Sequence, residues 1–126
     1  MANLQKVVLI SGSTNGIGKA VAARFIHDGF TVIQNSRNKI DKKDVLGAKH
    51  IMGDVTNYKT CLDIIETIKL EYGRLDVLVC NVGDGADLDS DNSTEERWSH
   101  FLSSNLLSTT FLVDAAISIL INQKEM

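Results

Sequence analysis

The chain has 126 residues, of which 44% are hydrophobic and 23% charged, and its formal net charge at pH 7 is -3. This size allows one small domain, and a slightly acidic chain without a long basic run argues against a nucleic-acid partner. The first apolar run begins within a few residues of Met1, which leaves no room for a signal peptide, so we expect a cytoplasmic protein.

A glycine-rich turn joins the first predicted strand to the first predicted helix. Residues 6–10 are apolar and rich in β-branched side chains, as in a strand buried within a parallel sheet. In the turn, Gly12 allows the chain to reverse, Gly16 allows a ligand to approach the backbone, and Gly18 allows the helix to pack closely. The helix N-terminus then offers free N–H groups and a positive dipole end to a pyrophosphate. The candidate cofactor-binding residues of this turn are Gly12, Ser13, Thr14, Asn15, Gly16, Ile17 and Gly18.

The spacing Gly-x-x-x-Gly-x-Gly is one residue wider than the Gly-x-Gly-x-x-Gly fingerprint of dinucleotide sites. Its context is a βαβ unit, because a helical pattern follows with apolar Ile17, Ala20, Val21 and Phe25 and a second strand begins near Phe30. The alternative is a glycine-rich turn with only a packing role.

The tip of the second strand, residues 30–35, favours NADP over NAD. An NAD site needs an acid near this tip for the ribose 2′-hydroxyl, whereas an arginine can hold the 2′-phosphate of NADP. Here Ser36 and Arg37 follow the strand, and no acid occurs before Asp41. The alternative for Arg37 is a solvated basic loop.

The third and fourth predicted strands end at the same edge of the sheet. Residues 39–47 form a loop with at most one helical turn, and the third strand, 48–52, leads to Asp54 and Val55, where the carboxylate can accept a hydrogen bond from the amine of adenine. Asp54 is equally compatible with a helix-cap or turn role.

A helix over 56–72 precedes the fourth strand, 75–80. The turn after that strand, Asn81-Val82-Gly83, faces the same crevice, and both cysteines, Cys61 and Cys80, are expected to be reduced packing residues.

The last predicted element is one helix from the capping box Ser93-x-x-Glu96 to about residue 122. Its apolar residues exceed a single stripe, so one side is expected to cover the sheet and the other to form a homo-oligomer interface. Asp114 in its middle argues against a membrane span. The acidic loop 84–92 before it lacks the glycine and the bidentate glutamate of a calcium loop, so we predict no metal site.

Four motifs in this order resemble those of the classical short-chain dehydrogenases/reductases. They are Gly12-x-x-x-Gly16-Ile17-Gly18, Asp54-Val55, Asn81-Val82-Gly83, and Asn105 in the last helix. The resemblance covers essentially the whole chain and implies one α/β Rossmann-type domain over residues 1–126, a doubly wound parallel sheet in the order 3-2-1-4. The motif of the fourth strand departs from the family, which usually has Asn at the position of Cys80 and Ala at that of Val82.

The resemblance also implies roles for individual residues. The three glycines would bind the pyrophosphate, Asp54 and Val55 would contact the adenine, and Asn81 with Gly83 would support the ribose and the central sheet. Arg37 after Ser36 resembles the NADP-using members. Asn105 matches the catalytic asparagine that holds a water in the family's proton relay; otherwise it is a helix residue bonded to nearby backbone.

The family's catalytic Ser and Tyr-x-x-x-Lys motif are missing from these residues. The tyrosines are Tyr58 and Tyr72, and neither begins Tyr-x-x-x-Lys. We therefore expect the cofactor-binding half of a short-chain reductase, truncated before the later strands. Such a chain binds NADP but does not catalyse the hydride transfer between NADP(H) and a carbonyl or alcohol that a complete relative performs. The alternative is a non-catalytic nucleotide-binding or oligomerisation module.

Overall fold

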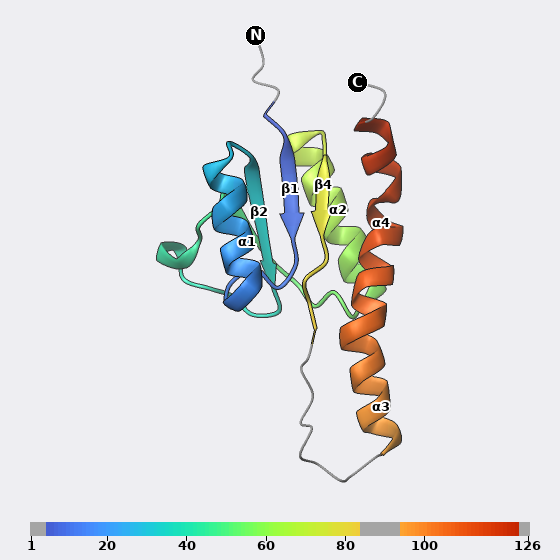
Figure 1. The fold of residues 1–126 in the computed structure, drawn as a ribbon. Coiled ribbons are helices and arrows are strands. Elements are labelled where there is room, and N and C mark those ends of the chain that lie inside the picture. Colours follow the sequence, from blue (N-terminus) through green and yellow to red (C-terminus); the bar gives the residue numbers. More distant parts are fainter. Residues whose placement is uncertain (1–4, 84–93, 124–126) are drawn as a thin grey trace.

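The computed structural model describes residues 5–83 and 94–123, and it contains a four-stranded parallel sheet in the order β3-β2-β1-β4 (Figure 1). The predicted fold class and strand order are therefore confirmed. The strands are β1 Val7–Ile10, β2 Thr31–Ser36, β3 Lys49–Met52 and β4 Val77–Val79. The helices are α1 Gly16–His27, α2 Tyr58–Tyr72, α3 Glu95–Leu102 and α4 Ser108–Gln123, with a 3-10 turn η1 at Lys42–Asp44 and a π-helical segment η2 at Ser103–Leu107.

Strand β1 lies in the middle of the sheet. Val8 pairs with Val32 of β2 on one side and with Val77 of β4 on the other, and β3 pairs with the outer side of β2. Because all the pairings are parallel, the carboxyl ends of the four strands meet at one edge, as the sequence predicts.

Helices cover both faces of the sheet (Figure 1). On one face, Val8 and Ile10 pack with Ala22 of α1. On the other, Leu9 of β1 packs in a larger core with residues of α2 and α4 such as Ile68 and Leu112. The alternation along β1 sends successive side chains into the two cores, which explains why this run is apolar throughout.

The apolar pattern of α1 does not match its buried face at the N-terminal end. Ile17 is 77% exposed and Ala20 is also exposed, whereas Gly18 and Ala22 are buried. Ile17 is therefore not part of the core on this face of the sheet. The helix ends at His27, and Gly29, with φ +88°, provides the left-handed stop.

The last helical region differs from the single helix predicted from a Ser93 cap. Its N-cap is Thr94, whose Oγ1 accepts a hydrogen bond from Arg97 N at 3.2 Å, while Ser93 lies outside the described residues. Segment η2 then interrupts the α-helical pattern, with Ser108 N donating to the carbonyl oxygen of Ser103. No proline or glycine marks this interruption in the sequence, so it could not be predicted.

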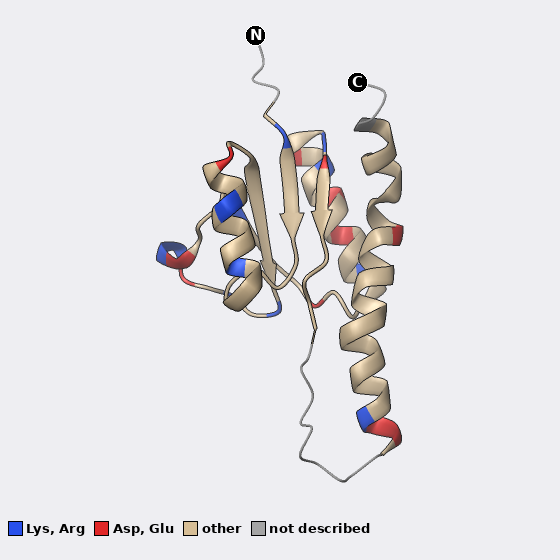
Figure 2. Ribbon diagram, viewed as in Figure 1, with Lys and Arg blue, Asp and Glu red and all other residues tan. Residues whose placement is uncertain are grey.

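Helix α4 packs on α2 through one side only. Leu112, Ala116 and Ile119 are buried in the core, and the hydroxyl of Tyr58 in α2 donates to Asp114 Oδ2 at 2.6 Å. Charged residues are sparse along this helical region (Figure 2). Large apolar side chains on the other side are exposed. These exposed residues, here called the outer apolar face, are Trp98, Leu102, Leu106, Val113, Ile117 and Ile121.

Among the described residues, the helical stretch Glu95–Asn122 alone has the length and composition of a membrane span. The core helix of a soluble protein can meet the same criteria, and α4 contributes to the core.

Candidate functional site

A cavity of about 630 Å³ opens at the carboxyl ends of the strands. It is bordered by the glycine-rich turn, by the tips of β2, β3 and β4, and by one side of α3 and η2. The predicted site residues that line it are Gly12, Thr14, Asn15, Gly16, Ile17, Ser36, Arg37, Asp54, Val55, Asn81, Val82 and Gly83. The structure thus brings together residues as far apart in the chain as Gly12 and Gly83.

The three glycines of the turn have different surroundings. Gly12 and Gly16 have φ of +60° and +55°, which disfavours any residue with a side chain. A Cβ on Gly18 would lie 2.2 Å from the Gly12 carbonyl oxygen, so this glycine permits contact between helix and turn rather than between helix and strand. A Cβ on Gly16 would have no neighbour within 4 Å, and Gly16 also lines the cavity, so the backbone here is open to a ligand.

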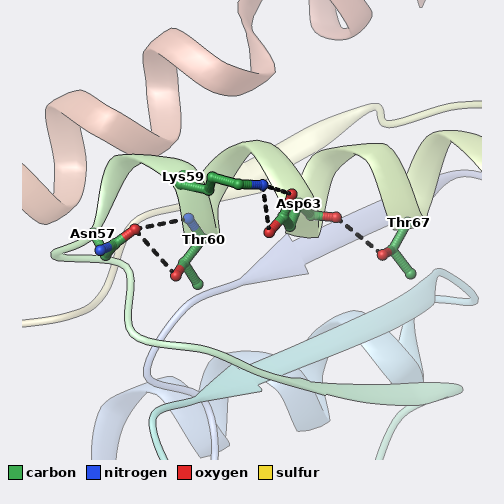
Figure 3. A network of polar contacts seen from close by, with 5 residues as sticks. All are labelled: Asn57, Lys59, Thr60, Asp63 and Thr67. Carbon is green, nitrogen blue, oxygen red and sulfur yellow. Dashed lines mark hydrogen bonds and ion pairs between the residues drawn. The ribbon is translucent and has the colours of Figure 1, made fainter.

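The N-terminus of α1 is the helix start that borders this open space. Its N-cap residue, Asn15, makes no side-chain capping hydrogen bond. In α2, by contrast, Asn57 Oδ1 accepts from Thr60 N at 3.0 Å and from Thr60 Oγ1 at 3.3 Å (Figure 3). Helix α3 is likewise capped by the side chain of Thr94. The first amides of α1 therefore remain available to an acceptor in the cavity.

Ser13 and Gly18 do not line the cavity, although both are among the predicted cofactor-binding residues. Ser13 is fully buried, and its hydroxyl donates to the Ile10 carbonyl oxygen at 2.7 Å and accepts from Asn35 N at 3.0 Å. Both residues stabilise the turn without lining the cavity, Ser13 through hydrogen bonds and Gly18 through close packing.

At the tip of β2, Arg37 is exposed and lines the cavity, while the hydroxyl of Ser36 is used within the protein. Ser36 Oγ donates to the Asn38 carbonyl oxygen at 2.8 Å and lies 2.7 Å from His50 Nε2. Because the single hydroxyl hydrogen is already donated, His50 Nε2 must act as the donor to Ser36. Burial lowers the pKa of His50, which favours the neutral ring.

At the tip of β3, Asp54 has the turn role that the sequence left open. Its Oδ1 accepts from Thr56 N at 2.9 Å and from Thr56 Oγ1 at 2.6 Å. These bonds, chiefly the one from the hydroxyl, and the positive charge of Arg37 hold the pKa of Asp54 below its usual value. Val55 is buried in the core and also borders the cavity.

The turn after β4 is bonded to the glycine-rich turn. Asn81 N donates a hydrogen bond to Ser11 Oγ at 3.0 Å, so this amide is not available to a ligand in the cavity. Asn81 Nδ2 donates to the Gly12 carbonyl oxygen at 3.0 Å. Asn81 thereby fixes Gly12 from the β4 side.

Asn105, the predicted catalytic residue, lies in η2 next to the cavity but does not line it. Its Nδ2 donates to the Phe101 carbonyl oxygen at 3.1 Å, and a Cβ on Gly83 would lie 3.0 Å from its Oδ1. Three other residues of this helical region line the cavity and were not predicted from the sequence, namely His100, Ser103 and Ser104. Their spacing of i, i+3 and i+4 was the available signal, since such residues share one face of a helix.

The tyrosine and cysteine side chains of the chain do not line the cavity. The pKa of Tyr58 is raised, mainly by its hydrogen bond to Asp114, and Tyr72 packs against the core, so neither tyrosine faces the cavity. Burial raises the pKa of Cys61 to about 11, and it also raises that of Cys80. Across residues 5–83 and 94–123 no group of His, Cys, Asp or Glu side chains could hold a metal ion. The acidic loop 84–92 lies outside the described residues.

Comparison with known proteins gives a consistent family assignment. The sequence model of the short chain dehydrogenase family matches residues 6–125. The diacetyl reductase [(S)-acetoin forming] of Staphylococcus epidermidis is 30% identical over 96% of this chain and 50% of its own length. Among solved structures, ligand-free aldohexose dehydrogenase of Thermoplasma acidophilum superposes with a TM-score of 0.79 at 32% identity, covering 94% of this chain and 45% of that one.

A second solved structure, a variant of ElxO with NADPH bound, is 29% identical with a TM-score of 0.82 and covers 91% of this chain and 50% of that one. The chain spans about half the length of the curated relatives that it matches. The covered share is 42% for an uncharacterized oxidoreductase of Bacillus subtilis and 50% for the diacetyl reductase. The matched part includes the whole cavity described above.

Proposed function

The chain belongs to the short-chain dehydrogenase family, and from this premise we propose that its cavity binds a nicotinamide dinucleotide with the pyrophosphate at the N-terminus of α1. The observation that carries the proposal is the combination of an uncapped helix start and the open space beside Gly16. A pyrophosphate there would accept hydrogen bonds from the free amides and gain from the helix dipole. The backbone therefore fits the group without any cationic side chain in the turn.

We further propose NADP as the preferred cofactor, with NAD the weaker ligand. Arg37 at the tip of β2 lines the cavity, and its guanidinium can form two parallel hydrogen bonds with a 2′-phosphate. No acidic side chain stands at this tip to accept a bond from a 2′-hydroxyl. The adenine would lie toward Asp54 and Val55. The relative ElxO, whose variant binds NADPH, supports this choice.

The whole-protein activity that we propose is an oxidoreductase reaction between NADP(H) and a carbonyl or alcohol. The bound nicotinamide would supply or accept the hydride. From this chain, Asn105 would hold a water near the reacting centre, while Asn81 and Gly83 would shape the ribose end of the cavity. The chain by itself is expected to bind the cofactor without turnover, because no tyrosine faces the cavity to act as acid or base. NADPH oxidation with varied carbonyls above the buffer rate would contradict this.

The binding proposal is tested by titrating the chain with NADPH and two matched glycine variants. Gly16→Ala and Gly29→Ala each place a side chain at positive φ with no neighbour within 4 Å, so both introduce similar backbone strain. Only Gly16 borders the cavity. We expect Gly16→Ala to abolish NADPH binding and Gly29→Ala to retain it. Equal affinity in the two variants would contradict the proposal.

A second candidate function, an oligomerisation module, is favoured by the outer apolar face. Single apolar side chains are common on protein surfaces, but six large ones exposed along one helical region are typical of an interaction site. We propose that this face forms a homo-oligomer interface in a cytoplasmic protein with no membrane or nucleic-acid partner. Light scattering is expected to give a defined dimer from the detergent-free soluble fraction, and Ile117→Glu to give a monomer. Recovery only from membranes would refute this reading.

A further inference from the structure

Beyond the proposed NADP site, on which this inference rests, we infer that Gln34 is a positioning residue that sets the preference for a 2′-phosphorylated ribose. Its side chain connects the glycine-rich turn with the far end of the loop that begins at Arg37. Gln34 does not itself line the cavity. It fixes the distance between the part of the site that holds the pyrophosphate and the part that faces the 2′-position.

The amide of Gln34 is fully buried and uses both of its ends. Nε2 donates to the Ser13 carbonyl oxygen at 3.0 Å. Oε1 accepts from Leu46 N at 2.8 Å and from Gly47 N at 3.0 Å. A fully buried polar side chain costs free energy unless its hydrogen bonds are made, and here three are made.

The loop between β2 and β3 depends on few other anchors. Within it, the turn η1 is closed by local bonds from Asp44 N and Val45 N, which do not tie it to the sheet. At its start, Ser36 Oγ holds the Asn38 carbonyl oxygen. Gln34 and Ser36 lie two positions apart on β2, so their side chains point to the same face and hold the two ends of the same loop.

The end of the loop is pressed closely against β2 at the Gln34 anchor. Ala48 N donates to the Val32 carbonyl oxygen at 2.9 Å. A Cβ on Gly47 would lie 2.3 Å from that same oxygen, so only glycine allows this approach. The approach of Gly47 and the bonds to Gln34 therefore form a single anchor, which can be disturbed from either side.

The anchor affects the preference for a 2′-phosphorylated ribose because the covalent bonds of the ligand limit the distance between its pyrophosphate and its 2′-position. Arg37, Asn38 and Ile40 of the loop line the same cavity as the glycine-rich turn. A dinucleotide whose pyrophosphate lies on the turn reaches Arg37 with its 2′-phosphate only while the loop stays in register with that turn. If the anchor is lost, a ligand with a 2′-hydroxyl keeps its contacts with the turn, whereas a 2′-phosphorylated ligand loses its additional contact.

The test compares 2′,5′-ADP with 5′-AMP as ligands of the full chain and of three variants. Gln34→Met removes the anchor, and Gly47→Ala displaces the same anchor by the clash with Val32 while Gln34 is retained. Gln5→Met is the control, because it removes an exposed glutamine that donates to the Gly29 carbonyl oxygen away from the cavity. Calorimetry gives both affinities, and hydrogen exchange at Leu46 and Gly47 reports the loop.

We expect both anchor variants to bind 2′,5′-ADP about tenfold more weakly and 5′-AMP within about twofold of the unmodified chain, as for the loss of one phosphate contact. Exchange at Leu46 and Gly47 should rise, and the control should change neither quantity. If Gln34→Met does not fold, Gly47→Ala decides. Equal weakening of both ligands would overturn the inference and leave the proposed function standing. Failure of the unmodified chain to bind either ligand would overturn both.

Discussion

Ser13 and Asn35 hold each other through two hydrogen bonds that run in opposite directions. Ser13 N donates to the Asn35 carbonyl oxygen at 3.1 Å, and Asn35 N donates to Ser13 Oγ at 3.0 Å. The side-chain amide of Asn35 continues to the carbonyl oxygens of Ile51 and Gly53 at 3.0 and 3.1 Å. One buried pair thus connects the glycine-rich turn to β2 and to the end of β3, which together form the floor of the cavity.

Replacing Ser13 tests this connection. Ser13→Ala leaves the buried Asn35 N–H without its acceptor, so we expect the free energy of unfolding to fall by about 1–3 kcal/mol. Urea denaturation followed by circular dichroism measures it. Ser99→Ala, at an exposed position of α3, is the control and should stay within about 0.5 kcal/mol of the unmodified chain. Equal stability of the two variants would show that the Ser13 hydroxyl contributes little.

Gly18 is predicted to tolerate no side chain. In Gly18→Ala the new Cβ would lie 2.2 Å from the Gly12 carbonyl oxygen and 2.4 Å from Asn81 Nδ2, so the turn must move. We expect a loss of stability of about 1–3 kcal/mol or more, together with loss of NADPH binding. Thermal unfolding and a fluorescence titration measure the two effects. Binding at full affinity would mean that the turn need not keep this shape.

Arg37 is predicted to distinguish the two nicotinamide cofactors. Arg37→Ala should weaken NADPH binding by about 1.5–3 kcal/mol, the value of a hydrogen bond to a charged group, and leave NADH nearly unchanged. Arg24→Ala is the matched control, because Arg24 is an exposed arginine of α1 paired with Asp28 and does not line the cavity. Calorimetric titrations with both cofactors provide the comparison. A parallel loss for NADPH and NADH would remove the case for NADP.

The glycine-rich turn could be predicted because its signals are local, whereas the order of the strands was implied by the resemblance to the short-chain dehydrogenases/reductases. The apolar run 6–10 and the positions of Gly12, Gly16 and Gly18 follow from backbone geometry and burial within a few residues of chain. The strand and helix boundaries differ from the predicted ones by one or two residues at most ends, as between the predicted strand 48–52 and the observed Lys49–Met52. The segment 39–47, predicted as a loop with at most one helical turn, contains one 3-10 turn at Lys42–Asp44.

What the sequence could not supply depends on contacts between distant segments. Gln34 gives no sign of its partners, because Ser13 and Gly47 meet it only once β2 is in place. Ile17 satisfies the apolar pattern of α1 but is exposed at the border of the cavity and takes no part in the core. The interruption at η2 is marked by no proline or glycine, and His100 comes to lie beside the tips of β2, β3 and β4 only in the folded chain.

Asp76 gives a prediction about acid stability. Its carboxylate accepts from Arg74 at 2.6 and 2.9 Å and from Val7 N at 2.8 Å, and the bond to Arg74 holds its pKa below the usual range. This stabilisation is present above the unfolded pKa, about 3.9, and is lost as pH falls through the folded one. Asp76→Asn should therefore lower the free energy of unfolding at neutral pH by about 1.5–3 kcal/mol and flatten its decline below about pH 4.

Urea denaturation across pH measures this effect. The control is Asp63→Asn, which breaks an exposed pair with Lys59 and should lower the free energy of unfolding by less than about 1 kcal/mol. Similar losses in the two variants would contradict a special role for Asp76.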